Sequence, residues 1–312
     1  MGTDVLKHID KYIVLENLGR GAKSTIWKVQ DPGNGTIYTL KRVIRETEDD
    51  DRFFEQMQTE HQVSGRINHE YIRKSYELRK VRSWFKTQEL LLILEYVEGK
   101  TLKQAPPIEM EDVIDLFIKV ARGLDVLHQA GFIHADMKPK NILLTGNGNI
   151  KLIDFGQSCP IGHRKKRVQG TPDYIAPEQV KRGMLDQRTD IFNFGASLYW
   201  VLTNQAYPTS MSQDTGDIHL APVKDVPRPD EVNNKVPMAL SNLTMACCSR
   251  EPAKRPENMA EVIARLDVAR HLLLRQKSPE KYARTKEKKE LSQKPVSADD
   301  TAEFERFLED IL

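Results

Sequence analysis

The sequence has few of the features that mark a secreted or membrane-spanning protein. It contains only three cysteines, Cys159, Cys247 and Cys248. They cannot all pair within the chain, and neighbours in sequence rarely bridge, so they indicate a reducing compartment. No apolar run approaches the ~18 residues that span a bilayer, and no basic-then-apolar signal opens the chain. We expect no membrane span and a cytoplasmic location.

An excess of one charge is also missing. The 47 Lys and Arg residues nearly balance the 45 Asp and Glu residues, for a formal net charge of +2. Broad affinity for nucleic acid usually needs a larger positive excess, so no specific nucleic-acid partner is expected, although local runs of one sign exist. At 312 residues and 39% hydrophobic content, the chain is long enough for two lobes with cores.

The hydrophobic spacing changes along the chain. Before about Glu95, short alternating segments and turn signals such as residues 31–35 predict a small antiparallel sheet interrupted by one helix. Beyond it, apolar residues recur at helical spacing from Val113 to Leu127, and Gly131 is placed to end that helix. The pattern predicts an α+β fold with a mostly helical second half.

The most specific chemical pattern is His-Ala-Asp-Met-Lys-Pro-Lys-Asn at 134–141, followed by Asp-Phe-Gly at 154–156. It supplies a carboxylate that can orient a hydroxyl and a lysine two positions later that can meet a charged phosphate. It also supplies an Asn and an Asp suited to Mg²⁺. These are the side chains that phosphoryl transfer requires.

Upstream, residues 18–24 form a glycine-containing turn between two expected strands. Glycines let backbone N–H groups approach phosphate closely, but two glycines between strands are more often an ordinary turn. Lys41 on the next strand and Glu60 on a helical stretch favour the functional interpretation, because such a pair positions the α- and β-phosphates of a nucleotide.

On these motifs the chain resembles the eukaryotic-type (Hanks-type) serine/threonine protein kinases, most of all bacterial members, over residues 9–275. The resemblance implies a bilobal protein-kinase-like fold, with a sheet-containing N-lobe over about 9–95 and a helical C-lobe over about 98–275. It also implies transfer of the ATP γ-phosphoryl group to Ser or Thr hydroxyls of protein substrates, with Mg²⁺ or alternatively Mn²⁺.

The resemblance assigns a role to each matching residue. Asp136 is the expected catalytic base, Lys138 contacts the γ-phosphate, and Asn141 and Asp154 bind the metal ion. The residues expected around ATP are Leu18, Gly19, Arg20, Gly21, Ala22, Ile26, Thr39, Lys41, Glu60, Leu94, Glu95, Val97 and Leu143. Leu94 is the expected gatekeeper, beside an adenine-facing backbone at Glu95 and Val97.

Three further residues match structural positions of the family. Glu178, in Ala-Pro-Glu at 176–178, is expected to pair with Arg255, and Asp190 is expected to anchor the loop that carries the catalytic base. Thr171 and Lys138 resemble the serine/threonine branch rather than tyrosine kinases.

The departures from the family pattern concern activation. Ala135 replaces the arginine that usually clamps a phosphorylated activation loop, and residues 159–170 contain no Ser, Thr or Tyr. Both the hydroxyl that would be phosphorylated and the arginine that would bind its phosphate are therefore missing. We therefore predict activity without activation-loop phosphorylation. Cys159 in this segment is either an inert thiol, which we favour, or a redox handle.

The loop carries a basic run at 163–167, and an acidic run at 46–51 precedes the Glu60 helix. Two solvated charge runs are the simpler interpretation. A sharper hypothesis is that the two runs attract one another and hold loop and helix together, although single exposed pairs contribute only ~0–1 kcal/mol. A third alternative is that the basic run docks acidic substrates or partners.

Two small residues stand where the family has large apolar ones. Ser64 and Ser75 are the expected N-lobe members of the internal stack completed by His134 and Phe155. Serines supply little apolar packing. Either the register slips by one at Tyr76, or the helix has another support.

The last part of the chain changes character. Residues 276–299 are polar and lysine-rich and predict a basic flexible linker, whereas 300–312 predict a short amphipathic helix. This helix would dock in cis beside the N-lobe helix, mediate dimerisation or bind a partner, or remain disordered.

Three rival functions remain open. A nucleotide-binding pseudokinase would keep the fold without transfer, but the expected catalytic and metal residues are all present. A small-molecule kinase fits a small residue at 135 but not the segment 170–178, which resembles a polypeptide-docking element. A pure interaction module fits least.

Overall fold

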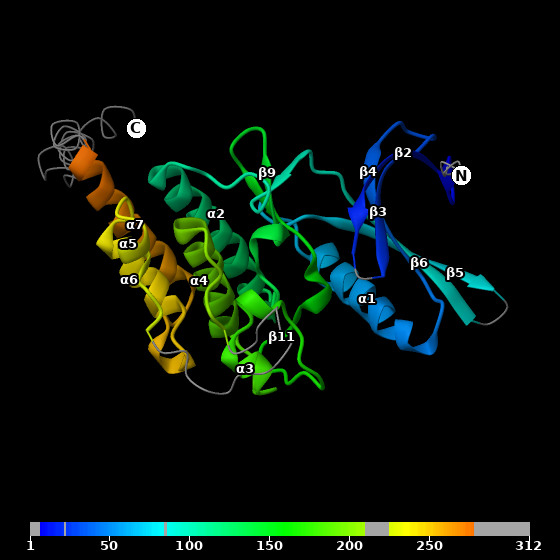
Figure 1. Ribbon diagram of the computed structural model, residues 1–312. Helices are drawn as coiled ribbons and strands as arrows, with labels where there is room; N and C mark the ends of the chain where they lie inside the picture. The colour runs from blue at the N-terminus through cyan, green and yellow to red at the C-terminus, as the bar shows by residue number, and fades with distance from the viewer. Residues whose placement is uncertain (1–6, 22, 84–85, 210–224, 278–312) are drawn as a thin grey trace, which may run out of the picture. The chain divides into compact units, whose positions relative to one another are not determined.

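Six strands near the N-terminus form one antiparallel sheet in the order β1-β2-β3-β4-β6-β5 (Figure 1). The computed structural model describes residues 7–21, 23–83, 86–209 and 225–277. The strands and the helix of this lobe are β1 His8–Ile9, β2 Tyr12–Arg20, β3 Ser24–Gln30, β4 Ile37–Ile44, α1 Asp51–Arg66, β5 Ser75–Ser83 and β6 Lys86–Glu95.

The sheet is buried on two faces where β6 crosses it. Leu91 and Ile93 face a cluster with Leu40 of β4, while Leu90, Leu92 and Leu94 face the other side. There they pack with Phe54 and Met57 of α1. Because successive side chains of a strand point to opposite faces, burial on both sides explains the unbroken apolar run at 90–94.

The buried stripe of α1 is chemically mixed. Phe54, Met57, Glu60, Val63 and Ser64 are its buried residues, spaced so that they follow one side of the helix. A carboxylate thus lies in a row of otherwise mostly apolar contacts. The helix ends at Arg66, and the chain then enters β5 through residues 67–74.

The remaining elements follow β6 and are mostly helical. The longer helices are α2 Met110–Gln129, α4 Gln187–Thr203, α6 Met238–Cys247 and α7 Met259–Lys277. The shorter elements are β7 Gly99–Thr101, β8 Phe132–Ile133, η2 Pro139–Asn141, β9 Ile142–Thr145, β10 Ile150–Leu152, η3 Phe155–Gln157, β11 Cys159–Pro160, η4 Pro172–Tyr174, α3 Pro177–Val180, α5 Pro229–Val232 and η5 Pro252–Lys254. The predicted α+β fold with its sheet-containing N-lobe and helical C-lobe is confirmed.

The helix expected over 113–127 is α2, and its apolar stripe is core. Val113, Phe117 and Leu124 are completely buried. Gly131 follows the helix with φ +84°, a conformation that glycine adopts without the strain a side chain would add.

Several expectations concern residues at the edge of the described chain. Residues 1–269 form one compact unit, and the residues from 270 onward belong to another. Gln276 and Lys277, expected to open the linker, belong instead to α7. The rest of the predicted linker, the helix at 300–312 and Ala22 lie outside the described residues. No helix in the described ranges combines the length and the apolar character of a bilayer span.

Candidate active site

The loop between β8 and β9 holds Asp136 in a closed set of hydrogen bonds. Lys138 Nζ donates to Asp136 Oδ2 at 2.6 Å and to Thr171 Oγ1 at 2.6 Å. Thr171 Oγ1 donates to Asp136 Oδ1 at 2.8 Å, and Asn141 Nδ2 donates to the Asp136 carbonyl at 2.8 Å. Asp136 is 8% exposed. The carboxylate is therefore held in one orientation in a largely buried position.

Asp190 of α4 anchors the backbone of this loop, as predicted. Its completely buried carboxylate accepts from the backbone N–H of His134 at 2.7 Å and of Ala135 at 2.8 Å. His128 Nε2 lies 2.9 Å from the same carboxylate. Burial alone would raise the pKa of Asp190, but these hydrogen bonds outweigh it and the pKa is lowered. The anchor therefore stays ionised.

Ala135 adopts a backbone conformation that is uncommon for a residue with a side chain. Its φ is +59°, in the left-handed region, which costs about 1–2 kcal/mol for an L-residue. Its N–H bonds to Asp190, and its carbonyl accepts from Gln179 Nε2 at 2.8 Å. These bonds hold the strained residue directly before Asp136.

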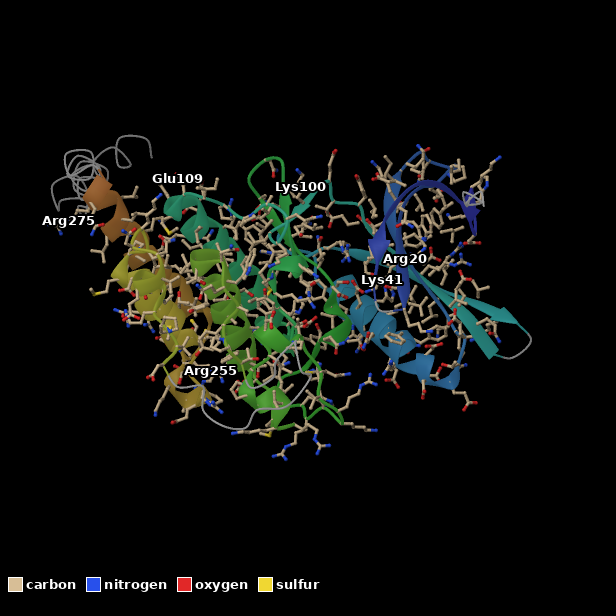
Figure 2. All side chains as sticks on the ribbon, in the orientation of Figure 1. Arg20, Lys41, Lys100, Glu109, Arg255 and Arg275 are labelled. Atoms are coloured by element: carbon tan, nitrogen blue, oxygen red, sulfur yellow. The ribbon has the colours of Figure 1, made fainter. Side chains whose placement is uncertain are left out.

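Lys41 joins two carboxylates from distant parts of the chain. Its Nζ lies 2.7 Å from Glu60 Oε2 and 3.0 Å from Asp154 Oδ1, so the predicted Lys41–Glu60 pair is present. Lys41 projects from β4 of the sheet (Figure 2). Burial would lower the pKa of Lys41, but Asp154 and Glu60 outweigh it and hold the pKa above its usual range. The Lys41 ammonium keeps the pKa of Asp154 below its usual range.

Asn141 and Asp154 offer oxygens suited to a divalent ion. Asn141 uses its Nδ2 on the Asp136 carbonyl, which leaves Oδ1 as an acceptor, and the ionised Asp154 side chain is 45% exposed. The described residues contain no cluster of three or more Asp, Glu, His or Cys side chains with metal-binding geometry. Two protein ligands fit Mg²⁺, which usually keeps waters and takes substrate phosphates as its other ligands.

The glycine-containing hairpin connects β2 to β3. Gly19 has φ +146°, and its N–H donates to Asn17 Oδ1 at 2.9 Å, while the N–H of Gly21 donates to the Ser24 carbonyl at 2.8 Å. A Cβ at Gly21 would meet Ser24 Oγ at 2.5 Å, so a side chain here would require this serine to change its rotamer. Of the other expected residues, Leu18 and Arg20 are exposed and Ile26 is half-buried opposite Gly19.

The expected adenine side lies where β6 ends. Leu94 is 1% exposed and pairs with Thr39 of β4. The backbone N–H of Glu95 donates to the Lys74 carbonyl, and its carboxylate accepts from Lys151 at 2.9 Å. The Glu95 N–H is therefore engaged within the protein. Val97 follows the strand, and Leu143 lies half-buried on β9.

The two serines of the internal stack are buried, so the alternative of a register slip is wrong. Ser75 is 2% exposed and pairs with Leu94, whereas Tyr76 is 54% exposed beside a β-bulge. Ser75 Oγ lies 2.8 Å from His61 Nδ1, and Ser64 Oγ donates to the Glu60 carbonyl at 2.7 Å. Ser64 and Ser75 therefore make hydrogen bonds at the two positions where the family has apolar side chains that pack.

The sequence analysis did not single out two residues that bond to the site. One bonds to Glu60, and the other bonds to the backbone next to Asp136. Arg73, 8% exposed, donates through Nη2 to Glu60 Oε1 at 3.2 Å. Gln179, 3% exposed, donates to the carbonyls of Ala135 and Gln169 at 2.8 and 3.1 Å. Arg73 carries no motif signal. Gln179 directly follows the Ala-Pro-Glu motif, which was the one available clue.

The hypothesis that the acidic and basic runs pair with each other is wrong for the described residues. Glu46 pairs with Lys23 at 2.8 Å, and Asp51 pairs with Arg45. Asp50 accepts from the backbone N–H groups of Glu46 and Thr47, both at 2.9 Å. Glu46, Asp50 and Asp51 are therefore engaged within their own lobe.

Other expected contacts are present. Arg255 donates to both Glu178 oxygens, at 2.7 and 2.9 Å, which confirms the pair that closes the activation segment. The ring of His134 lies 5.1 Å from that of Phe155. Burial raises the pKa of the Cys159 thiol to about 11, so it stays protonated at neutral pH, in agreement with an inert thiol.

The chain matches the family described as "Protein kinase domain" over residues 12–265. A probable serine/threonine-protein kinase of Clostridium acetobutylicum is 29% identical over 268 residues, which cover 82% of this chain and 39% of the relative. Serine/threonine-protein kinase PknL of Mycobacterium tuberculosis is 28% identical over 258 residues, 78% of this chain and 62% of PknL. The chain thus spans less than two thirds of these relatives.

The probable serine/threonine-protein kinase PknB of Lactococcus lactis is 25% identical over 302 residues, which cover 92% of this chain and 46% of the relative. The family match over residues 12–265 includes the loop of Asp136, the Asp-Phe-Gly motif and the Lys41–Glu60 pair described above. The protein therefore belongs to the protein kinase family, whose members use ATP and a divalent metal ion.

Proposed function

We propose that this protein is a serine/threonine kinase that transfers the ATP γ-phosphoryl group to hydroxyl groups of protein substrates. The observation that carries the proposal is the pairing of Lys41 with both Glu60 and Asp154, at 2.7 and 3.0 Å. The Lys41 ammonium on β4 thus joins Glu60 of α1, in the N-lobe, to Asp154, which precedes η3 in the C-lobe. Asp136, with its Lys138 and Thr171 partners, supplies the second half of the site. The names of the bacterial relatives favour Ser and Thr as acceptors.

Each residue has a separate task in the proposed reaction. Lys41, held by Glu60, positions the α- and β-phosphates, and the hairpin at 18–24 covers them. Asn141 and Asp154 would hold Mg²⁺, which neutralises phosphate charge when bound. Asp136 accepts a hydrogen bond from the substrate hydroxyl and aligns it, and Lys138 neutralises charge on the transferred group. Both lysines must remain cationic.

We further propose that the enzyme is active without phosphorylation of its activation segment. Gln179 links the carbonyl of Ala135, next to the catalytic base, with the carbonyl of Gln169 in that segment. Its Oε1 accepts from the N–H of Ala176 at 3.0 Å and from Asn193 Nδ2 at 3.1 Å. One neutral side chain makes the connection that a phosphate and an arginine would otherwise make.

Labelled ATP and a degenerate peptide array with Ser, Thr or Tyr acceptors test this function. We expect transfer to Ser and Thr peptides, at a rate that phosphatase treatment of the enzyme does not reduce. ATP binding without transfer would instead identify a pseudokinase. Loss of activity after phosphatase treatment would contradict phosphorylation independence. The roles of residues 276–299 as linker and 300–312 in docking or dimerisation remain predictions.

Replacing Gln179 by Glu should lower kcat by about tenfold or more with little change in the KM for ATP. The substitution keeps the acceptor but removes the donor to Ala135 and Gln169, and an unsatisfied buried carbonyl costs about 1–3 kcal/mol. The exposed Gln62→Glu variant on α1 is the control for charge. Steady-state kinetics decide: equal loss in both variants, or a change confined to the KM for ATP, would exclude a positioning role.

A further inference from the structure

A basic pocket of about 440 Å³ lies between α1 and the activation segment. Helix α1 contributes Arg52, Glu55, Gln56 and Thr59, and the other wall comes from residues 156–169. Its cationic or titratable basic side chains are Arg52, His163, Arg164, Lys165, Lys166 and Arg167. Glu55 is the one acidic residue of the lining, so the pocket has a strongly positive potential.

These cations lack carboxylate partners. In the ranges that the structure describes, no ion pair involves Arg52, Arg164 or residues 165–167. Arg52 instead lies over the ring of Phe53, 4.6 Å from its centre. Lys165 donates to the carbonyl of Gln157, and burial lowers the pKa of its ammonium. Like charges gathered around a single acidic side chain of the lining, Glu55, repel one another, and an anion bound among them would relieve that repulsion.

A buried hydroxyl also lines the pocket without a partner. Ser158 is 6% exposed, and its Oγ makes no hydrogen bond in the structure. Buried polar groups are almost always hydrogen-bonded, so an orphan hydroxyl in a pocket wall suggests a missing acceptor. A phosphate oxygen is such an acceptor, and the neighbouring guanidinium and ammonium groups are its preferred donors.

Apart from Glu55 in its lining, the pocket has no acidic side chain of the described chain within it. In the acidic run 46–51, Glu46, Asp50 and Asp51 are engaged by Lys23, Arg45 and backbone N–H groups. Residues 159–170 contain no hydroxyl side chain that a kinase would phosphorylate. The pocket therefore has the donors for a phosphate but lacks the segment that would carry one.

We propose that this pocket binds a phosphoserine or phosphothreonine of another polypeptide and thereby ties α1 to the activation segment. A phosphate dianion matches several Arg and Lys donors better than a single carboxylate does. A single half-open pocket of about 440 Å³ on a chain of net charge +2 fits one phosphate rather than the extended basic surface that nucleic acid requires. Binding in trans would raise activity above the basal level that needs no loop phosphorylation.

Fluorescence anisotropy with the full chain tests the binding directly. The probe is a labelled peptide with one phosphoserine flanked by Gly and Ala, compared with the same peptide carrying Ser or Glu. We expect the phosphopeptide to bind at least about tenfold tighter than either. The triple variant Arg164→Gln, Lys166→Gln, Arg167→Gln should lose about tenfold or more of that affinity. Binding does not depend on phosphoryl transfer, so the outcome is separable from the proposed function.

The matched control removes three exposed cations elsewhere, Arg66→Gln, Lys80→Gln and Lys181→Gln. It should bind the phosphopeptide nearly as the unaltered chain does. Equal losses in the two triple variants would show nonspecific attraction and overturn the proposal. Equal affinity for the Glu peptide would exclude phosphate recognition. Competition by inorganic phosphate at the peptide's own concentration, or stronger competition by a single-stranded oligonucleotide, would exclude a phosphopolypeptide as the ligand.

Discussion

Replacing Asp136 by alanine should lower kcat by about 10²–10⁴-fold while leaving ATP affinity nearly unchanged. The lost carboxylate is the group that we assign to the acceptor hydroxyl. It bonds to Lys138 and Thr171, whereas Lys41, to which we assign the positioning of the phosphates, pairs with Glu60 and Asp154. The two sets of contacts share no hydrogen bond among side chains, so nucleotide binding should survive the loss of the base.

Single-turnover transfer and an independent ATP-binding measurement distinguish these effects. The control is Asp112→Ala, which removes an exposed carboxylate from the first turn of α2. It should leave both quantities unchanged. Weakened ATP binding with an undiminished rate of transfer in Asp136→Ala would contradict the assignment of Asp136 as the base. A comparable fall in the control would point to a general loss of folded protein.

Sequence predicted the placement of the site residues best where a motif sets particular residue types at fixed spacing. Asp136 and Asn141 lie in one short loop, so their proximity follows from the chain itself. The Lys41–Glu60 pair was predictable because the family motif links a strand lysine to a helix glutamate. The fold followed from hydrophobic spacing, including the buried run at 90–94 and the α2 stripe.

The remaining contacts depend on how side chains meet across the fold. Gln179 and Ala135 are 44 residues apart, and nothing in composition or spacing says that an amide will reach that carbonyl. Opposite charge alone also led to a wrong prediction of which residues pair. The acidic run 46–51 and the basic run 163–167 are complementary, but Lys23 and Arg45 are nearer partners in space.

Ser64 and Ser75 show a second kind of contact that the sequence could not predict. Sequence correctly placed Ser64 and Ser75 in the interior, but not what supports the helix there. The structure supplies polar contacts, from His61 to Ser75, from Lys74 Nζ to the Gly65 carbonyl at 2.9 Å, and from Arg73 to Glu60. Helix α1 is therefore held by directional bonds as well as by Phe54 and Met57. Such bonds are costly to leave half-made in a buried site.

The consequence is that Glu60→Gln should both destabilise the protein and impair transfer. The Glu60 side chain is 1% exposed and faces two cations, Lys41 and Arg73, whose side chains are 15% and 9% exposed. Removing its charge leaves Arg73 buried without a counter-charge, which costs about 3–5 kcal/mol of unfolding free energy. Lys41 keeps only Asp154, so kcat/KM for ATP should fall by about 10²-fold, which corresponds to roughly 2.7 kcal/mol. Urea unfolding and steady-state kinetics measure the two effects.

A double-mutant cycle separates charge pairing from packing at this position. Adding Arg73→Met to Glu60→Gln removes the orphaned cation, so the double variant should be more stable than the sum of the single losses by about 1 kcal/mol or more. Its activity should stay low, because Lys41 still lacks Glu60. The control is Glu89→Gln, which breaks the more exposed Arg42–Glu89 pair, 2.8 Å long, and should cost only about 1 kcal/mol. Strictly additive losses at Glu60 and Arg73 would show that the buried arginine does not act through this carboxylate.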